Sequence, residues 1–113
     1  MNPQLEIVFT GEQLRDAGIS LAVDHAESKS PDWKKVTYEL FKEFLKTHRA
    51  PFLLEEFRSW LALKDDYVFP PSGRAFGFIT PKAAREGLIE QIGTGKVNNP
   101  KAHKANAARW IRK

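Results

Sequence analysis

In Ala83-Ala84-Arg85-Glu86-Gly87-Leu88-Ile89, residues 83–89, the hydrophobic pattern changes from a helical to a strand-like period. Before Gly87, apolar residues recur at three- and four-residue steps, whereas residues 88–92 form a short run compatible with a β-strand. Glycine readily adopts the left-handed conformation that commonly ends a helix. The junction therefore predicts a helix ending at residue 86 and a strand over 88–92.

Toward the C-terminus, a second β-compatible run covers residues 108–112. The segment between the two runs is dense in turn residues over 93–100. The simplest structure for this part of the chain is a long β-hairpin tipped by a basic loop.

Toward the N-terminus, residues 74–86 read as a helix with Ser72 as a possible cap. Because of Pro81, the sequence allows two different starting points for this helix. A helix that begins near Ser72 would be kinked at Pro81, whereas Thr80 as the N-cap would start the regular part only at Pro81. The inward positions of this helix are Phe76, Ile79 and Ala83.

Two further helices are expected over residues 32–48 and 53–63. Ser30-Pro31-Asp32 interrupts the preceding segment and offers Ser30 as an N-cap with proline at the first helical position. The stripe expected to be buried in the first of these helices comprises Trp33, Val36, Leu40 and Phe44, widened by Phe41 and Leu45. The second places Phe57, Trp60 and Leu61 on one face.

An additional helix is expected over residues 11–28. Thr10 and Gln13 have the spacing of a capping box. The apolar stripe of this helix would comprise Leu14, Ala17 and Leu21, with His25 as a further candidate.

Composition predicts one domain over residues 1–113, because 113 residues with 42% hydrophobic content suffice for one core and no more. The absence of cysteine excludes disulfides, thiol catalysis and Cys-ligated metals. No apolar run is long enough to span a membrane, and no signal peptide is recognisable. We therefore expect a cytoplasmic protein that does not enter a membrane.

The net charge of +4 is unevenly distributed. The last acidic residue is Glu90, and residues 91–113 carry a charge of +6, while residues 1–90 carry −2. Such a basic end is either a solvated tail or a surface for a polyanion.

The order helix, helix, loop, helix, strand, loop, strand resembles a winged helix, an α+β and mostly helical class with a three-helix core and a C-terminal β-hairpin wing. Here an extra N-terminal helix precedes that core. The chain also resembles small phage and prophage winged-helix proteins from about residue 11 onward. The residues that carry this resemblance are Arg74-Ala75-Phe76-Gly77, Gly87-Leu88-Ile89, Pro100, His103 and Trp110. It implies a virus or prophage as the source and no particular activity.

In that fold the helix over 74–86 would lie in the major groove of double-stranded DNA and the wing would contact the backbone. The positions expected to face outward on the helix are Arg74, Gly77, Phe78, Lys82 and Arg85, of which Arg74 suits guanine, while Lys82 and Arg85 suit phosphates. On the hairpin the candidates for phosphate contact are Lys96, Lys101, His103, Lys104 and Arg109. His103 is equally suited to packing on Trp110. Trp33 and Trp60 are expected in the core.

The function expected from these features is DNA binding in phage gene regulation or replication, by a monomer or a homodimer. The alternative is an adaptor of the same fold that engages a host or phage protein, motivated by the acidic and apolar character of residues 1–66 and by Pro81 and Phe78 on the supposed reading face. An enzyme is not expected. His25, His48 and His103 lie in separate segments without a metal-binding spacing, so no metal or cofactor is predicted.

Overall fold

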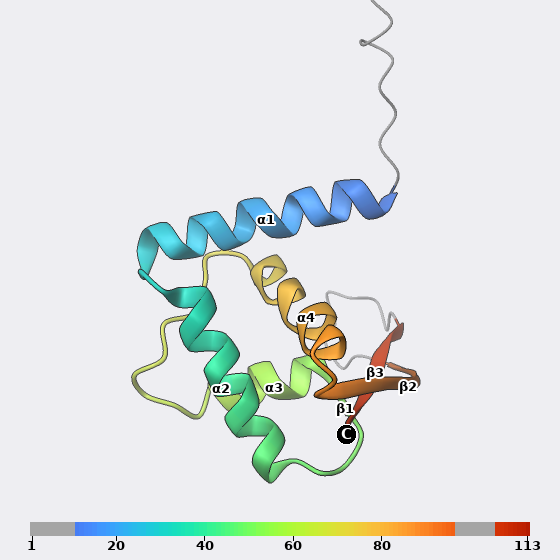
Figure 1. The fold of residues 1–113 in the computed structure, drawn as a ribbon. Helices are drawn as coiled ribbons and strands as arrows, with labels where there is room; N and C mark the ends of the chain where they lie inside the picture. The colour runs from blue at the N-terminus through green and yellow to red at the C-terminus, as the bar shows by residue number, and fades with distance from the viewer. Residues whose placement is uncertain (1–10, 97–105) are drawn as a thin grey trace, which may run out of the picture.

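The computed structural model describes residues 11–96 and 106–113, which form an α+β fold of helices packed on a small sheet (Figure 1). The predicted helices over 11–28, 32–48 and 53–63 are present with slightly different ends. In order, the elements are α1 (Gly11–Lys29), α2 (Trp33–Thr47), β1 (Phe52–Leu53), α3 (Leu54–Leu61), the 3-10 helix η2 (Gly73–Phe78), α4 (Ile79–Arg85), β2 (Ile89–Lys96) and β3 (Asn106–Arg112).

The sheet has three antiparallel strands in the order β1-β3-β2. Strands β2 and β3 pair from Ile89 opposite Arg112 to Lys96 opposite Asn106, so the hairpin strands are longer than the predicted 88–92 and 108–112. β1 was not predicted, because a strand of two residues is too short to show an alternating hydrophobic pattern. Phe52 of β1 pairs with Trp110 of β3, which fastens the end of α2 to the hairpin.

Aromatic side chains of α2 form the centre of the core. Phe41 is fully buried, and its ring centroid lies 5.1 Å from that of Phe57 in α3 and 6.0 Å from that of Phe52 in β1. Both pairs are edge-to-face, an arrangement that aromatic rings favour. Trp33 is also buried, as expected, whereas Trp60 is only partly buried against the core.

One position of the predicted α2 stripe is wrong. Val36 is 49% exposed, and its neighbour Thr37 is buried instead. The Thr37 hydroxyl lies 3.0 Å from the hydroxyl of Tyr67, which also accepts a hydrogen bond from Trp33 Nε1 at 3.1 Å. These bonds satisfy the buried polar atoms of α2 and hold the 62–72 loop on its surface.

The start of α2 also differs from the prediction. Ser30 does not cap the helix. Asp32 is the N-cap residue, with φ of 63° and no side-chain capping bond, and the amide of Trp33 donates to the carbonyl oxygen of Ser30. Ser30-Pro31-Asp32 thus forms the expected interruption through a backbone turn.

Helix α1 packs through a different face from the one predicted. Leu14 and Leu21 are 59% and 71% exposed, whereas Ala22, Val23 and Ala26 are buried. Small side chains on this face let α1 lie close across the η2 end of the η2–α4 segment, as Figure 1 shows. The predicted Thr10 cap lies outside the described residues.

The predicted helix over 74–86 consists of two parts, η2 and α4. Ser72 Oγ accepts a hydrogen bond from the Arg74 amide at 3.3 Å, which caps η2. α4 begins at Ile79, so Pro81 lies in its first turn, where a missing N–H breaks no helical hydrogen bond. The burial expected for Phe76, Ile79 and Ala83 is confirmed, as is the left-handed Gly87, with φ of 75°.

Candidate nucleic-acid interface

A hollow of about 740 Å³ lies between α1, α3, η2 and β3. Three arginines from three different elements line it: Arg15 of α1, Arg58 of α3 and Arg74 of η2. We call it the arginine hollow. Its remaining walls include Ile19, Leu54, Phe76, Ala108 and Trp110, which are apolar. Among the described residues that line it, Glu55 is the single carboxylate.

Two of these arginines lie beside glycines of neighbouring segments. The guanidinium carbon of Arg58 lies 5.2 Å from the ring centroid of Phe76, in a cation–π contact. A Cβ atom on Gly73 would lie 2.8 Å from Arg58 Nη2, so the glycine leaves room for that side chain. Arg74 extends toward α1, where a Cβ on Gly18 would lie 3.5 Å from Arg74 Nη1. Both cations therefore line the same hollow.

The arginine hollow carries net positive charge. Lys42 pairs with Glu39 and Lys82 pairs with Glu86, and neither pair includes an arginine of the hollow. Three guanidinium groups against one carboxylate attract anions, and the low-dielectric apolar walls strengthen that attraction.

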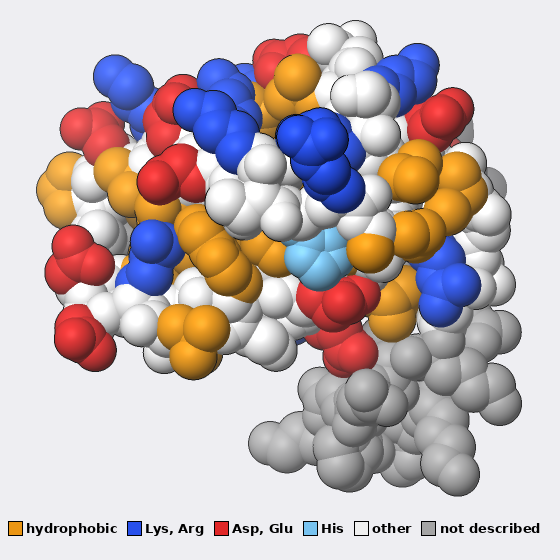
Figure 2. All heavy atoms as spheres, turned by 90° about the horizontal axis from the view of Figure 1, so that it is seen from below, with side chains coloured by type: hydrophobic (Ala, Val, Ile, Leu, Met, Phe, Trp, Pro, Cys, Tyr) orange, Lys and Arg blue, Asp and Glu red, His pale blue; other side chains and the backbone are white. Residues whose placement is uncertain are grey.

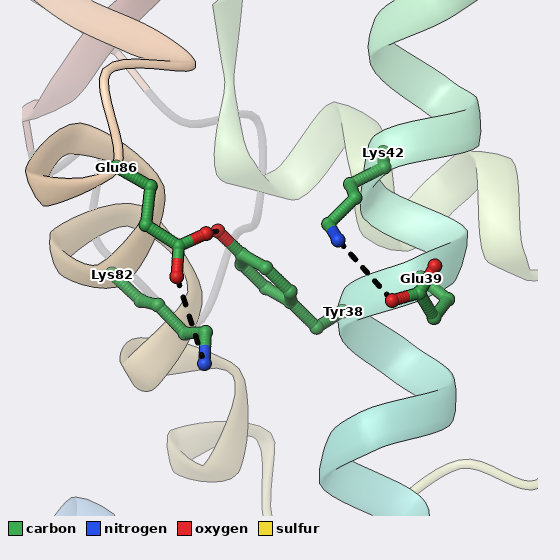
Figure 3. Close-up of polar contacts among 5 residues, drawn as sticks. All are labelled: Tyr38, Glu39, Lys42, Lys82 and Glu86. Carbon is green, nitrogen blue, oxygen red and sulfur yellow. Dashed lines mark hydrogen bonds and ion pairs between the residues drawn. The ribbon is translucent and has the colours of Figure 1, made fainter.

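Lys82, predicted to act beside Arg74, lies elsewhere. Figure 3 shows it next to Glu86, with its ammonium nitrogen 3.9 Å from Glu86 Oε2. The same nitrogen is 4.8 Å from the ring centroid of Tyr38, whose hydroxyl donates to Glu86 Oε1 at 2.5 Å. Lys82 lines a separate hollow between α2 and α4, so the structure does not bring it together with Arg74.

The predicted outward positions Gly77 and Phe78 are wrong. A Cβ on Gly77 would lie 2.7 Å from Ile19 Cδ1, so this glycine permits the close approach of α1. The Phe78 ring packs edge-to-face on Trp33, with centroids 5.8 Å apart. Gly77 and Phe78 are therefore partly covered by other elements of the protein, whereas Arg74 is exposed.

The structure describes only some of the other residues that were predicted to contact DNA. Arg85 is exposed at the end of α4, and Arg109 is exposed on β3, where its guanidinium group lies beside Gly95. Lys101, His103 and Lys104, together with the side chain of Lys96, lie outside the described part of the structure. On the face seen in Figure 2, basic side chains alternate with acidic and apolar ones, so this face has no continuous basic surface.

Arg15 and Arg58 could not be selected from the sequence pattern. Each lies on the polar side of its helix, and their convergence with Arg74 follows only from how α1 and α3 pack around η2. Within residues 11–96 and 106–113, no group of three or more His, Asp or Glu side chains has a geometry that could hold a metal ion. Nor does any helix in those ranges combine the length and apolarity needed to cross a bilayer.

The surroundings of the two tyrosines raise the pKa values of both hydroxyl groups. Burial, followed by the hydrogen bond to the Glu86 carboxylate, raises the pKa of Tyr38 far above its ordinary value of 10.0. Burial also raises the pKa of Tyr67, against the opposing effect of its bonds to Thr37 and Trp33. These are the only two tyrosines in the chain.

We therefore expect ultraviolet titration to show no tyrosinate near pH 10 in the folded protein and two ordinary ionisations after unfolding in urea. Because the folded-state pKa values are raised, the stability that the neutral phenols provide is complete below about pH 10 and is lost as the pH rises above it. Tyr38→Phe should remove one of the two late ionisations. A folded-state phenol titrating at the ordinary value would contradict this environment.

Comparisons with protein-family models, curated proteins and solved structures found no match to this chain.

Proposed function

We propose that the chain is a winged-helix protein that binds double-stranded DNA. The order α2, β1, α3, α4, β2, β3 and the sheet order β1-β3-β2 correspond to a three-helix core followed by a wing. In that fold the third helix and the wing face the DNA. The corresponding elements here are η2 with α4, and the β2–β3 hairpin. The resemblance suggests a virus or prophage as the source, and gene regulation or replication is the setting that we propose for DNA binding there.

The observation that carries this proposal is the arginine hollow. Arg74 comes from the segment that starts the third helix, and β3 of the wing forms one wall of the same hollow. Guanidinium groups bind phosphate oxygens in a bidentate manner and remain charged at every physiological pH. Arg15 and Arg58 add two such groups at the same place, and Arg109 is a further exposed cation on β3 of the wing.

The position of α1 favours contact with the DNA backbone over reading of the bases. Ile19 covers Gly77, and Phe78 is packed on Trp33, so neither position is free to enter a major groove. Phosphate contacts give affinity without sequence information. We therefore propose binding with little sequence discrimination and a strong dependence on salt.

The test is fluorescence anisotropy with a labelled duplex at several salt concentrations. If about four to six phosphates are contacted, the logarithm of the affinity should fall with the logarithm of salt with a slope of about −4 to −5. In Arg58→Gln/Arg74→Gln we expect an affinity roughly 10- to 100-fold lower and a slope reduced by about 2, because each phosphate contact contributes about 1 to the slope.

The matched control is Lys35→Gln/Lys42→Gln, which also removes two positive charges but from α2, away from the hollow, where Lys42 pairs with Glu39 at 3.2 Å. It should retain nearly the wild-type affinity. Thermal melting followed by circular dichroism checks that all variants are folded. Absence of duplex binding by the wild-type chain even at low salt would refute the proposal.

A protein-interaction adaptor is the second candidate. Leu14 and Leu21 are separated by two helical turns on α1 and are largely exposed, at 59% and 71%. Large apolar side chains grouped on one exposed helix face are typical of surfaces that bind another protein. A chain that fails the duplex titration but remains folded would leave this candidate as the better one.

A further inference from the structure

We infer that the arginine hollow receives an unpaired nucleotide of a DNA strand, with its phosphate between the guanidinium groups and its base against the apolar walls. This inference rests on the proposed function and specifies the form of DNA that the site prefers.

The size of the hollow is the first argument. At about 740 Å³ it falls in the range of pockets that hold organic ligands, and it is far larger than one phosphate requires. Phosphates of a duplex lie on the outside of a stiff double helix and need only exposed cations on the protein surface. A recess between four elements instead suits a flexible strand that can turn one nucleotide inward.

The lining is the second argument. Ile19, Leu54 and the half-buried Trp110 provide apolar wall, and Phe76 lies beneath the Arg58 guanidinium. Unpaired bases stack on aromatic rings and on guanidinium planes, whatever their sequence. The combination of flat apolar surfaces with cations matches a nucleotide, which is itself an aromatic ring joined to an anion.

The charge around the hollow is the third argument. Among the described lining residues, the guanidinium groups of Arg15, Arg58 and Arg74 outnumber the one carboxylate, that of Glu55. Cations beside a stacking recess are the arrangement with which proteins follow the backbone of single strands. An acidic peptide is the competing anion, and it lacks the rings that these walls would stack on.

The test compares an oligothymidylate of about 12 nucleotides with a duplex of the same length at one salt concentration. We expect the single strand to bind at least about tenfold more tightly and to quench tryptophan fluorescence. The quench should be lost in Trp110→Phe, because Trp110 lines the hollow whereas Trp33 and Trp60 do not.

A filling variant tests the recess separately from the charge of its arginines. Ala108→Phe places a ring in the recess without changing any charge, whereas Ala84→Phe adds the same ring on an exposed position of α4 that does not line the hollow. We expect Ala108→Phe to lose the preference for the single strand, whereas Ala84→Phe should keep it.

The outcomes distinguish the two proposals. Equal or tighter binding of the duplex by the wild-type chain overturns the unpaired-nucleotide site and leaves duplex binding intact. Binding of neither DNA overturns both. Competition by polyglutamate as effective as that by oligothymidylate would assign the hollow to acidic peptides and also overturn the inference.

Discussion

Phe41→Ala should lower the free energy of unfolding by roughly 3–5 kcal/mol, the largest stability loss expected from one substitution in this chain. Phe41 is fully buried and lies between Phe57 of α3 and Phe52 of β1, with edge-to-face contacts to both. Removing its ring leaves a cavity where α2, α3 and the sheet meet. Since domains of this size are stable by about 5–15 kcal/mol, a large part of that stability would be lost.

Urea unfolding followed by circular dichroism measures this change. Val36→Ala is the matched control, because it shortens a side chain on the same helix that is 49% exposed. We expect that change to stay within about 0.5 kcal/mol. A comparable loss in both variants would mean that the core is not centred on Phe41.

Gly77→Leu should displace α1 from the rest of the molecule. Even a Cβ at this position would lie 2.7 Å from Ile19 Cδ1 and 3.0 Å from Ile19 Cγ1, and the further atoms of leucine have no free space on this side. Overpacking of this kind costs about 1–3 kcal/mol. The rest of the α1 contact face consists mainly of small side chains, so we expect α1 to detach while the core of α2, α3 and α4 remains folded.

Hydrogen exchange provides the readout. Amides of α1 should lose most of their protection, whereas those of α2 should keep theirs. Adding Ile19→Ala removes the atoms that clash and should restore part of the α1 protection. Leu21→Ser, on the exposed side of the same helix, should leave exchange unchanged. Uniform loss of protection in α2 and α1 would contradict an independently docked helix.

The helices were predictable because apolar residues recur at helical spacing over long segments. α2 places a large apolar side chain on its buried face at each turn, and Pro31 and Gly87 mark ends that the backbone itself requires. The face of α1 was not predictable in this way. Its leucines suggested one stripe, but the opposing surface at Gly77 accepts a close approach, which favours Ala22 and Ala26 over larger side chains.

The candidate site was predictable only through Arg74. Its neighbour in the sequence pattern, Lys82, is paired with Glu86 on the α2 side, whereas Arg15 and Arg58 reach Arg74 from helices distant in sequence. This convergence of arginines depends on how the helices pack in three dimensions. The spacing of residues within one helix does not reveal it. The same holds for β1, whose two residues are defined by their partners in β3.

The pairing of Phe52 with Trp110 also bears on how the chain acquires its structure. The helices can form from contacts between close neighbours, but this sheet joins residues from the middle of the chain to others near residue 113. Closing so long a loop carries an entropic cost before any contact is gained. We therefore expect the pairing of β3 with Phe52 and Leu53 to form late in folding.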